Sequence, residues 1–138
     1  MAVGFKVKYY WYMVGYGDFL HSFFSNICYH LEGRRWGSKY PCLMRELYQG
    51  KLSRDRIQCA MKEINSIKYE FARIPPSKVV WDIDDLKKIP PWGDDICPSI
   101  KDLSTYFITS SGENLFFVLE RALNQAKLLN EDLFIDSL

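Results

Sequence analysis

The sequence predicts an α+β fold in which helices pack on a small, mostly antiparallel sheet of about four strands. Apolar residues alternate with polar ones in short segments, which is the period of a strand, and recur every three to four residues in longer ones, which is the period of a helix. The predicted element order is β-α-α-α-β-β-α-β. Because strands and helices do not alternate strictly, a doubly wound parallel sheet is not expected. A chain of 138 residues with 48% hydrophobic side chains can bury a core, so we expect a single domain over residues 1–138.

The beginning of the chain is predicted to form a strand and then a helix. Apolar and polar side chains alternate over residues 5–14, which are rich in β-branched and aromatic residues, and this indicates a strand. Asp18 can cap a helix through its carboxylate. Seven apolar residues then share one face of a helix over residues 18–31, which Gly33 ends.

Two further helices are predicted in the middle of the chain. Proline suits the first turn of a helix, so Pro41 favours a short helix over residues 41–48. Ser53 is the expected N-cap of a long amphipathic helix. That helix must end before the prolines at 75–76, because proline lacks an amide donor and disfavours helical geometry in the preceding residue.

The last part of the chain is predicted to contain three strands and one more helix. Ser110 and Glu113 have the spacing of a capping box at the start of that helix. The predicted elements are a strand over 78–83, an ordered loop over 84–98, a strand over 103–109, a helix over 115–126 and a strand over 133–136.

The cysteines and the first residues indicate the compartment. The cysteines are too far apart for a C-x-x-C pair, which a zinc site usually contains. Lysines interrupt any apolar run near the N-terminus, so we expect no signal peptide. We therefore expect a cytoplasmic protein whose four cysteines are reduced and mostly buried. They are Cys28, Cys42, Cys59 and Cys97.

Signals for catalysis and for cofactors are weak. Gly15 and Gly17 lie between a predicted strand and a helix, but Leu20 occupies the third glycine position of a dinucleotide-binding fingerprint. No phosphate-binding P-loop is present. His21 and His30 lie about 2.5 turns apart on their predicted helix, so they face nearly opposite directions. We therefore expect no enzyme, no cofactor and no metal site, and an enzyme around either histidine is the last of the alternatives.

The near-neutral total charge hides an asymmetry between the two halves of the chain. Residues 1–74 carry twelve Lys and Arg against six Asp and Glu, whereas residues 75–138 carry six against eleven, which together give the net charge of +1. Such an asymmetry often indicates a charged partner. The alternative is that the halves interleave in the fold and form a mixed surface. The neutral total argues against a general nucleic-acid-binding protein.

One candidate binding loop is basic and aromatic. Arg35, Trp36 and Tyr40 lie among further cations over residues 34–40. Such a loop can stack on and neutralise nucleic acid, and Trp, Tyr and Arg are also frequent at protein-binding hot spots. The alternative is a solvated turn with Trp36 folded into the core.

A second candidate loop is acidic and contains tryptophan. Five of the 17 acidic residues lie within residues 81–95, so this loop could attract a basic protein surface around an aromatic anchor. Its prolines reduce the entropy lost on binding. The alternative is a structural crossover in which the tryptophan plugs the core and the aspartates cap turns. The candidate residues are Trp92, Asp94, Asp95, Asp84 and Asp85.

Several motifs resemble the immunity protein 70 family of bacterial polymorphic toxin systems. They are LHSFFS at 20–25, WGSKYP at 36–41, LYQGKL at 47–52, PSKVVWDIDDL at 76–86, PPWG at 90–93 and YF at 106–107. The resemblance covers nearly the whole chain in order and brings no catalytic motif with it.

The resemblance implies a partner and a function. Such a protein would bind the C-terminal effector domain of a toxin and inhibit it stoichiometrically, without turnover. The toxin's chemistry is not fixed by the resemblance, although nucleases are common in such systems. We expect the acidic loop to contact the toxin, with the basic loop as a second candidate surface, and we expect neither membrane nor direct nucleic-acid binding. The alternative is a nucleic-acid or regulatory binding module that uses the basic N-terminal half.

Overall fold

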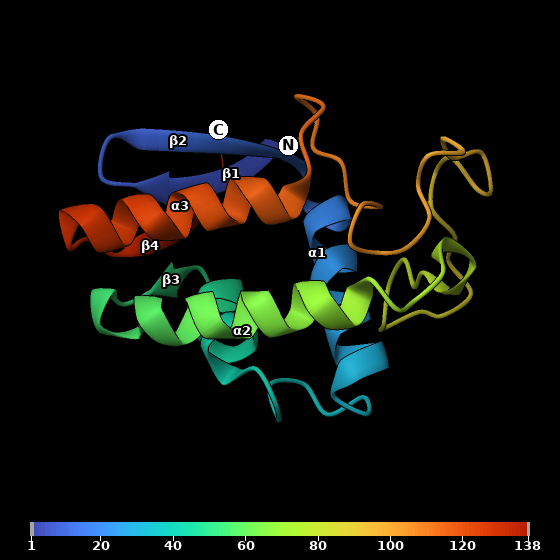
Figure 1. The fold of residues 1–138 in the computed structure, drawn as a ribbon, viewed down its shortest axis with the longest axis horizontal. Coiled ribbons are helices and arrows are strands. Elements are labelled where there is room, and N and C mark those ends of the chain that lie inside the picture. Colours follow the sequence, from blue (N-terminus) through green and yellow to red (C-terminus); the bar gives the residue numbers. More distant parts are fainter. Residues whose placement is uncertain (1, 138) are drawn as a thin grey trace.

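Within residues 2–137, which the computed structural model describes, four antiparallel strands form one sheet in the order β2-β1-β4-β3 (Figure 1). The predicted α+β fold, with helices packed on a small antiparallel sheet, is confirmed. The strands are β1 (Ala2–Val7), β2 (Tyr10–Tyr16), β3 (Lys51–Leu52) and β4 (Leu133–Ser137), and the three longest helices are α1 (Gly17–Asn26), α2 (Ile57–Phe71) and α3 (Leu115–Leu129).

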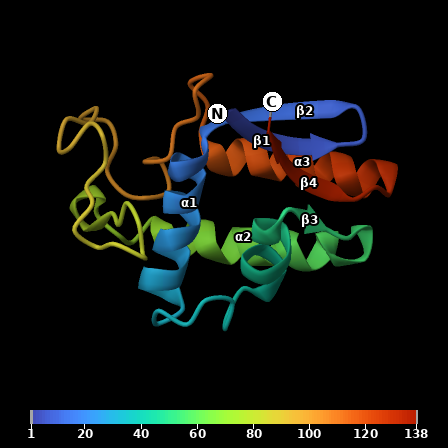
Figure 2. The same ribbon diagram turned by 180° about the vertical axis from the view of Figure 1, so that it is seen from behind.

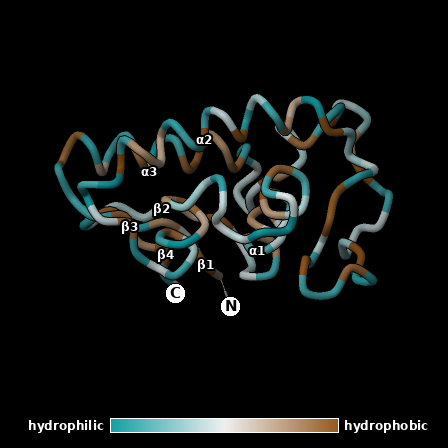
Figure 3. The backbone as a smooth tube through the Cα atoms, turned by 90° about the horizontal axis from the view of Figure 1, so that it is seen from below, coloured by the Kyte–Doolittle hydropathy of each residue, from teal (hydrophilic) through white to brown (hydrophobic). Residues whose placement is uncertain are grey.

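The helices and the sheet form two layers around one core. Figure 3 shows α2 and α3 on one side of the molecule and the strands on the other. Helix α1 runs across one end of both helices (Figure 1). Phe23 of α1 lies where these elements meet, with its ring edge-on to Phe71 of α2, Phe116 of α3 and Phe107. The buried side chains form a single hydrophobic cluster around them.

The N-terminal strand is in fact a hairpin. The predicted strand over 5–14 is divided between β1 and β2, which pair with Phe5 opposite Tyr12 and Val7 opposite Tyr10. Lys8 in the connecting turn has a positive φ of 54°. The prediction missed the turn because it contains no Gly, Pro, Asn or Asp, and because apolar and polar residues keep alternating through it.

A glycine in β1 allows β1 and β2 to pack closely. A Cβ atom at Gly4 would lie 2.5 Å from the carbonyl oxygen of Tyr12 and 2.8 Å from the ring of Trp11. Gly4 and Trp11 lie on the sheet face opposite Phe5, which is fully buried. The missing side chain therefore lets the indole lie across β1.

The helix predictions are largely confirmed. Helix α1 continues through a π-helical turn, Ile27–Leu31, so together they cover the predicted range. A short helix, Cys42–Glu46, follows Pro41 as expected. Ser53 caps the turn that leads into α2, because its Oγ accepts a hydrogen bond from the amide of Asp55.

The two strands predicted over 78–83 and 103–109 are wrong. Residues 72–114 contain no strand and no α-helix, only a 3₁₀ turn at Pro76–Lys78 and a single bridge between Ile108 and Asn114. The observed order of strands and long helices is therefore β-β-α-β-α-α-β. We name residues 72–114 the connecting segment.

The start of α3 also differs from its prediction. Asn114 is the N-cap, and its Oδ1 accepts a hydrogen bond from the amide of Phe116 at 2.9 Å. Ser110 instead donates its backbone amide to the carbonyl oxygen of Val14 at 3.0 Å, so it contacts β2 rather than capping the helix. Both residues have side chains that can cap, and the sequence alone did not separate them.

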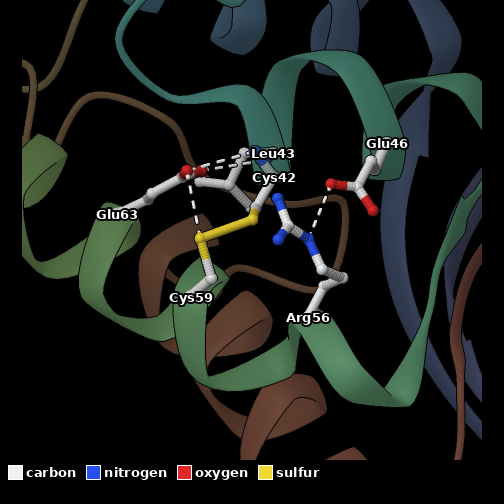
Figure 4. Close-up of a disulfide and its surroundings, with 6 residues drawn as sticks. All are labelled: Cys42, Leu43, Glu46, Arg56, Cys59 and Glu63. Carbon is white, nitrogen blue, oxygen red and sulfur yellow. Dashed lines mark hydrogen bonds and ion pairs between the residues drawn. A yellow bond between two sulfur atoms is a disulfide. The ribbon is translucent and has the colours of Figure 1, made fainter.

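Two of the cysteines form a disulfide, which corrects the expectation of four thiols. Cys42, at the start of the short helix, is bonded to Cys59 of α2, with 6.4 Å between their Cα atoms (Figure 4). Glu63 of α2 accepts hydrogen bonds from the amides of Cys42 and Leu43 and thus caps the short helix. Burial raises the pKa of Glu63, although these two hydrogen bonds oppose the shift. Cys28 is buried and Cys97 is exposed.

None of the helices in residues 2–137 combines the length and the apolar character needed to cross a membrane.

Candidate functional site

The connecting segment is held against α1 by polar side chains of that helix. The side-chain amide of Asn26 binds both backbone groups of Val80, with its Nδ2 and Oδ1 each 2.8 Å from their partners. Ser22 donates to the same carbonyl at 2.8 Å, and Ser25 accepts from the amide of Ile83 at 3.2 Å. These side chains satisfy backbone groups that a neighbouring strand would otherwise bind, so the extended residues need no sheet. Both views of the ribbon show the segment beyond α1, at one end of the molecule (Figures 1 and 2).

His21 forms a polar and aromatic cluster between α1 and the connecting segment. Its Nδ1 lies 2.7 Å from the hydroxyl of Tyr48, and its Nε2 lies 3.1 Å from Oδ1 of Asp82 and 3.5 Å from Oδ2 of Asp84. The ring of Trp36 is stacked on the imidazole at an interplanar angle of 18°. We name these five residues the His21 cluster.

The electrostatics of the His21 cluster keep Asp82 ionised. Burial alone would raise the pKa of Asp82, but hydrogen bonds from the Asp84 amide and His21, with the charges of His21 and Lys88, lower it below its usual range. Burial and the two nearby carboxylates raise the pKa of Tyr48, so its hydroxyl stays protonated. The carboxylate of Asp82 therefore carries its negative charge beside the imidazole of His21.

Both histidines have hydrogen-bond partners outside their own helix. Nε2 of His30 lies 2.8 Å from the carbonyl oxygen of Lys78, so both histidines contact the connecting segment. Burial lowers the pKa of His30 and favours its neutral form. The sequence did contain a signal for this contact. Ser22, Ser25 and Asn26 form a polar stripe at helical spacing beside the apolar face of this helix.

Trp92 is exposed on the connecting segment but held by its neighbours. Its ring is edge-on to Trp81 at 5.3 Å between centroids, and its Nε1 donates a hydrogen bond to the hydroxyl of Tyr106 at 2.8 Å. Trp81 and Tyr106 are both buried, whereas Trp92 keeps 37% of its surface exposed. The indole is therefore fixed on its inner side and accessible on its outer side.

Two clefts with shared lining residues lie beside Trp92, and each contains one aspartate. A cleft of about 590 Å³ is lined by Val79, Ile89, Pro90, Asp94 and Tyr106, among others. A second, of about 310 Å³, is lined by Phe19, Trp92, Asp95, Ile100 and Tyr106, among others. Ile89 is 72% exposed at the first cleft. Each cleft therefore suits a partner that presents an apolar side chain with a positively charged group beside it.

The acidic candidates therefore fall into two groups. Trp92, Asp94 and Asp95 meet at the clefts. Asp84 belongs to the His21 cluster, where its carboxylate is 82% exposed. Asp85 is exposed, and its Oδ1 accepts a hydrogen bond from the amide of Lys87. The two groups are linked through Trp81, which precedes Asp82 in the chain and contacts the ring of Trp92.

The basic loop is built around a buried carboxylate. Glu32 accepts hydrogen bonds from the amides of Gly37, Lys39 and Tyr40, each at 2.9 Å. Tyr40 itself is buried, and its hydroxyl lies 3.2 Å from Oγ of Ser66. The backbone of this loop therefore folds around the buried Glu32 side chain, which precedes it in the chain.

The residues of the basic loop do not share one surface. Trp36 is half-buried, and its Nε1 donates to the carbonyl oxygen of Met44 at 2.7 Å. Its ring faces the imidazole of His21, and with Tyr40 in the core only Arg35 of the three candidates is exposed. Trp36 therefore lies in the same cluster as Asp84, although the sequence placed these residues in separate candidate surfaces.

The two charged halves of the chain interleave in the fold. Lys8 lies 3.9 Å from Glu131, Arg54 lies 3.3 Å from Asp132, and Lys68 of α2 donates to Glu120 of α3. Cations from the basic half therefore pair with acids from the acidic half. This arrangement does not favour a nucleic-acid-binding module built from the N-terminal half.

One comparison with known proteins identifies a family. Residues 5–135 match the sequence profile of immunity protein 70. The match extends from β1 to β4 and includes the whole connecting segment. No curated protein and no solved structure matches the chain. Because the profile covers almost all of the sequence, the chain belongs to the immunity protein 70 family.

Proposed function

We propose that this protein binds the effector domain of a cognate bacterial toxin and neutralises it stoichiometrically, as an inhibitor rather than an enzyme. Family membership supports a role in immunity against toxins. The finer proposal is that the protein acts in the cytoplasm of a cell that also produces the toxin of a polymorphic toxin system. It protects that cell by occupying a functional surface of the effector domain.

The connecting segment is the feature that supports a binding function most strongly. Long loops without regular structure are uncommon in compact domains and are usually functional or disordered. This one is held in place by the side chains of α1 and by the contacts of Trp92 with Trp81 and Tyr106. A loop that is already ordered loses less entropy when it binds a partner.

The clefts beside Trp92 give the proposed surface its chemistry. Trp92 supplies an accessible aromatic edge, Ile89 an exposed apolar side chain, and Asp94 and Asp95 two carboxylates. We propose that a cationic element of the toxin carries apolar side chains into these clefts. The exposed Asp84 and Asp85 extend the negative charge, while Arg35 is a candidate at the periphery.

The acidic character also supports one class of toxin. Proteins that bind nucleic acid do so through basic surfaces that contact phosphates. An acidic inhibitor complements such a surface and increases the rate of association. We therefore propose a nuclease as the class of toxin to test first.

Co-expression tests the function. The protein is produced together with the toxin effector domain encoded beside it, and cell survival and co-purification of a complex are measured. We expect the cells to survive and the two proteins to co-purify as a one-to-one complex. Continued toxicity with a folded, well-expressed protein would contradict the proposed function.

Substitutions at the clefts test the surface separately. Trp92→Ala combined with Asp94→Asn and Asp95→Asn should weaken toxin binding by at least about a hundredfold, since anchors at the centre of an interface contribute about 2 kcal/mol or more each. Asp94→Asn with Asp95→Asn alone leaves the Trp92 contacts intact and should still weaken it measurably.

A control variant makes comparable changes on α2 and in the turn before it. Tyr69→Ala with Asp55→Asn and Glu70→Gln removes an exposed aromatic ring and two acids away from the clefts. This variant should bind as the wild type does. If both cleft variants are folded and also bind unchanged, the toxin does not use this surface.

A further inference from the structure

We propose that His21, Asp82 and Asp84 form a binding site for a divalent transition-metal cation such as Zn²⁺. One ligand atom from each of these three residues lies within 4.8 Å of the other two. Nε2 of His21 lies 3.1 Å from Oδ1 of Asp82 and 3.5 Å from Oδ2 of Asp84, and such separations suit atoms that surround one cation at ligand distances of about 2.0–2.2 Å. The sequence did not predict a metal here, because α1 and residue 82 are far apart in the chain.

The imidazole of His21 is already oriented for this role. The Tyr48 hydroxyl lies 2.7 Å from Nδ1, and the Trp36 ring is stacked on the imidazole, so the ring has little freedom to turn. A metal-binding histidine usually donates its other N–H to an oxygen, which fixes the tautomer with a lone pair toward the metal. The Tyr48 oxygen can accept that hydrogen bond, which leaves Nε2 directed at the two carboxylates.

The local charge also favours a cation. With a neutral imidazole, two carboxylates face each other across Nε2, and the cation nearest to them is Lys88, whose Nζ lies 3.5 Å from the outer oxygen of Asp82. The Lys88 side chain is 58% exposed and can move away without leaving a buried charge. A divalent cation would neutralise the two carboxylates from within the cluster.

The type of ligand narrows the choice of metal. An imidazole nitrogen with two carboxylate oxygens suits zinc, cobalt, nickel or manganese better than magnesium or calcium, which prefer oxygen ligands alone. The carboxylate of Asp84 is 82% exposed, so water would complete the coordination on the outer side.

Metal binding would join two parts of the molecule. His21 belongs to α1, whereas Asp82 and Asp84 belong to the connecting segment. A cation that binds only the folded arrangement stabilises it in proportion to the logarithm of its concentration. This effect is independent of the toxin, so it goes beyond the proposed function and can be tested with the protein alone.

Titration with zinc and cobalt tests the site. The tag-free protein, first treated with a chelator, is titrated with Zn²⁺ by calorimetry and with Co²⁺ by visible absorption, and its thermal unfolding is followed with and without metal. We expect one equivalent to bind and the midpoint of unfolding to rise. Binding should weaken as the pH falls, because protons compete for Nε2.

Two neighbouring aspartates provide a matched pair of variants. Asp84→Asn removes a ligand whose exposed position makes misfolding unexpected, and it should weaken binding by at least about tenfold. Asp85→Asn makes the same change one residue further on, outside the cluster, and should leave the affinity unchanged. His21→Gln should remove the nitrogen ligand and change the Co²⁺ spectrum.

Three outcomes would overturn the proposal. The wild-type protein could show no saturable binding, or Asp84→Asn could bind as tightly as the wild type. The third is a thiolate-to-cobalt charge-transfer band, which would place the metal at a cysteine such as the exposed Cys97 instead.

Discussion

The layered body of the molecule and its connecting segment are held together by different interactions. The body consists of the sheet, α2 and α3, and it is stabilised by buried aromatic and aliphatic side chains around Phe23. The connecting segment is fixed around Val80 and Ile83 by hydrogen bonds from Ser22, Ser25 and Asn26, whereas further along it Leu103 and Phe107 are buried in the same core as the body. The free energy of hydrophobic burial is proportional to the buried area, whereas the strength of these hydrogen bonds depends on the positions of individual atoms.

Helix α1 serves both regions. Phe19, Leu20, Phe23 and Phe24 enter the hydrophobic core, while the polar stripe between them binds the backbone of the segment. Stability within a protein is not uniform, and regions that rely on few buried apolar contacts open first. We therefore expect the residues around Val80, which depend on these hydrogen bonds, to loosen more easily than the body.

The largest expected effect comes from the centre of the body. Phe23→Ala should lower the free energy of unfolding by about 3–5 kcal/mol, because it leaves a cavity among the surrounding aromatic rings. Denaturant unfolding measures it. Phe117→Ala makes the same change at a half-exposed site on α3 and should cost much less. Equal losses would mean that the core is not organised around Phe23.

The disulfide is the second test of the body. Replacing both Cys42 and Cys59 by alanine should lower the free energy of unfolding by about 2–4 kcal/mol, since the bond restricts the unfolded chain across a separation of 17 residues. Comparing thermal unfolding with and without a thiol reductant gives an independent measurement. Cys97→Ser should unfold like the wild type in both conditions.

A smaller effect should be confined to the segment. Asn26→Ala removes both bonds to Val80 and should cost about 1–3 kcal/mol, the range for leaving buried polar groups without partners. Hydrogen exchange should increase in residues 78–84 and remain slow in α2 and α3. Asn65→Ala, at an exposed position of α2, is the control. Uniformly faster exchange would show that segment and body unfold as one unit.

The smallest effect concerns pH. The pKa of Asp82 is lowered in the folded protein, so its contribution to stability is present above the ordinary aspartate range near about 3.9 and is lost as the pH falls through the folded-state value. Thermal unfolding of Asp82→Asn should therefore differ from that of the wild type at neutral pH and approach it in acid. Equal unfolding midpoints of the two proteins at neutral pH would contradict this contribution.

Sequence periodicity was sufficient for the long helices, although it missed the turn between β1 and β2. Helices α1, α2 and α3 each bury one apolar face, and that spacing is visible without a structure. The same reasoning failed over 78–83 and 103–109, because alternation reports only that two sides of a segment differ. The groups that bind the backbone of residues 80–83 are side chains of a helix more than fifty residues earlier. The polar stripe on that helix indicates a polar partner, but not which segment of the chain supplies it.

Only part of the candidate site could be predicted, because local patterns show which residues are unusual but not which distant residues they contact. Trp92, Asp94 and Asp95 are recognisable because an aromatic residue among charges in a loop is unusual by itself. The proximity of His21 to Asp82 and of Trp36 to the same imidazole depends on packing between distant parts of the chain. No local spacing in the sequence indicates it, so His21 appeared to be an ordinary residue at the side of an apolar face.

The bond from the amide of Ser110 to the carbonyl of Val14 has a consequence for solubility. Strand β2 lies at an edge of the sheet, and exposed edges invite pairing with other chains. Here the end of the connecting segment covers part of that edge, while the turn beside it carries Lys8. Loosening this end of the segment would uncover the strand, so the bond from Ser110 to Val14 also protects the protein against aggregation.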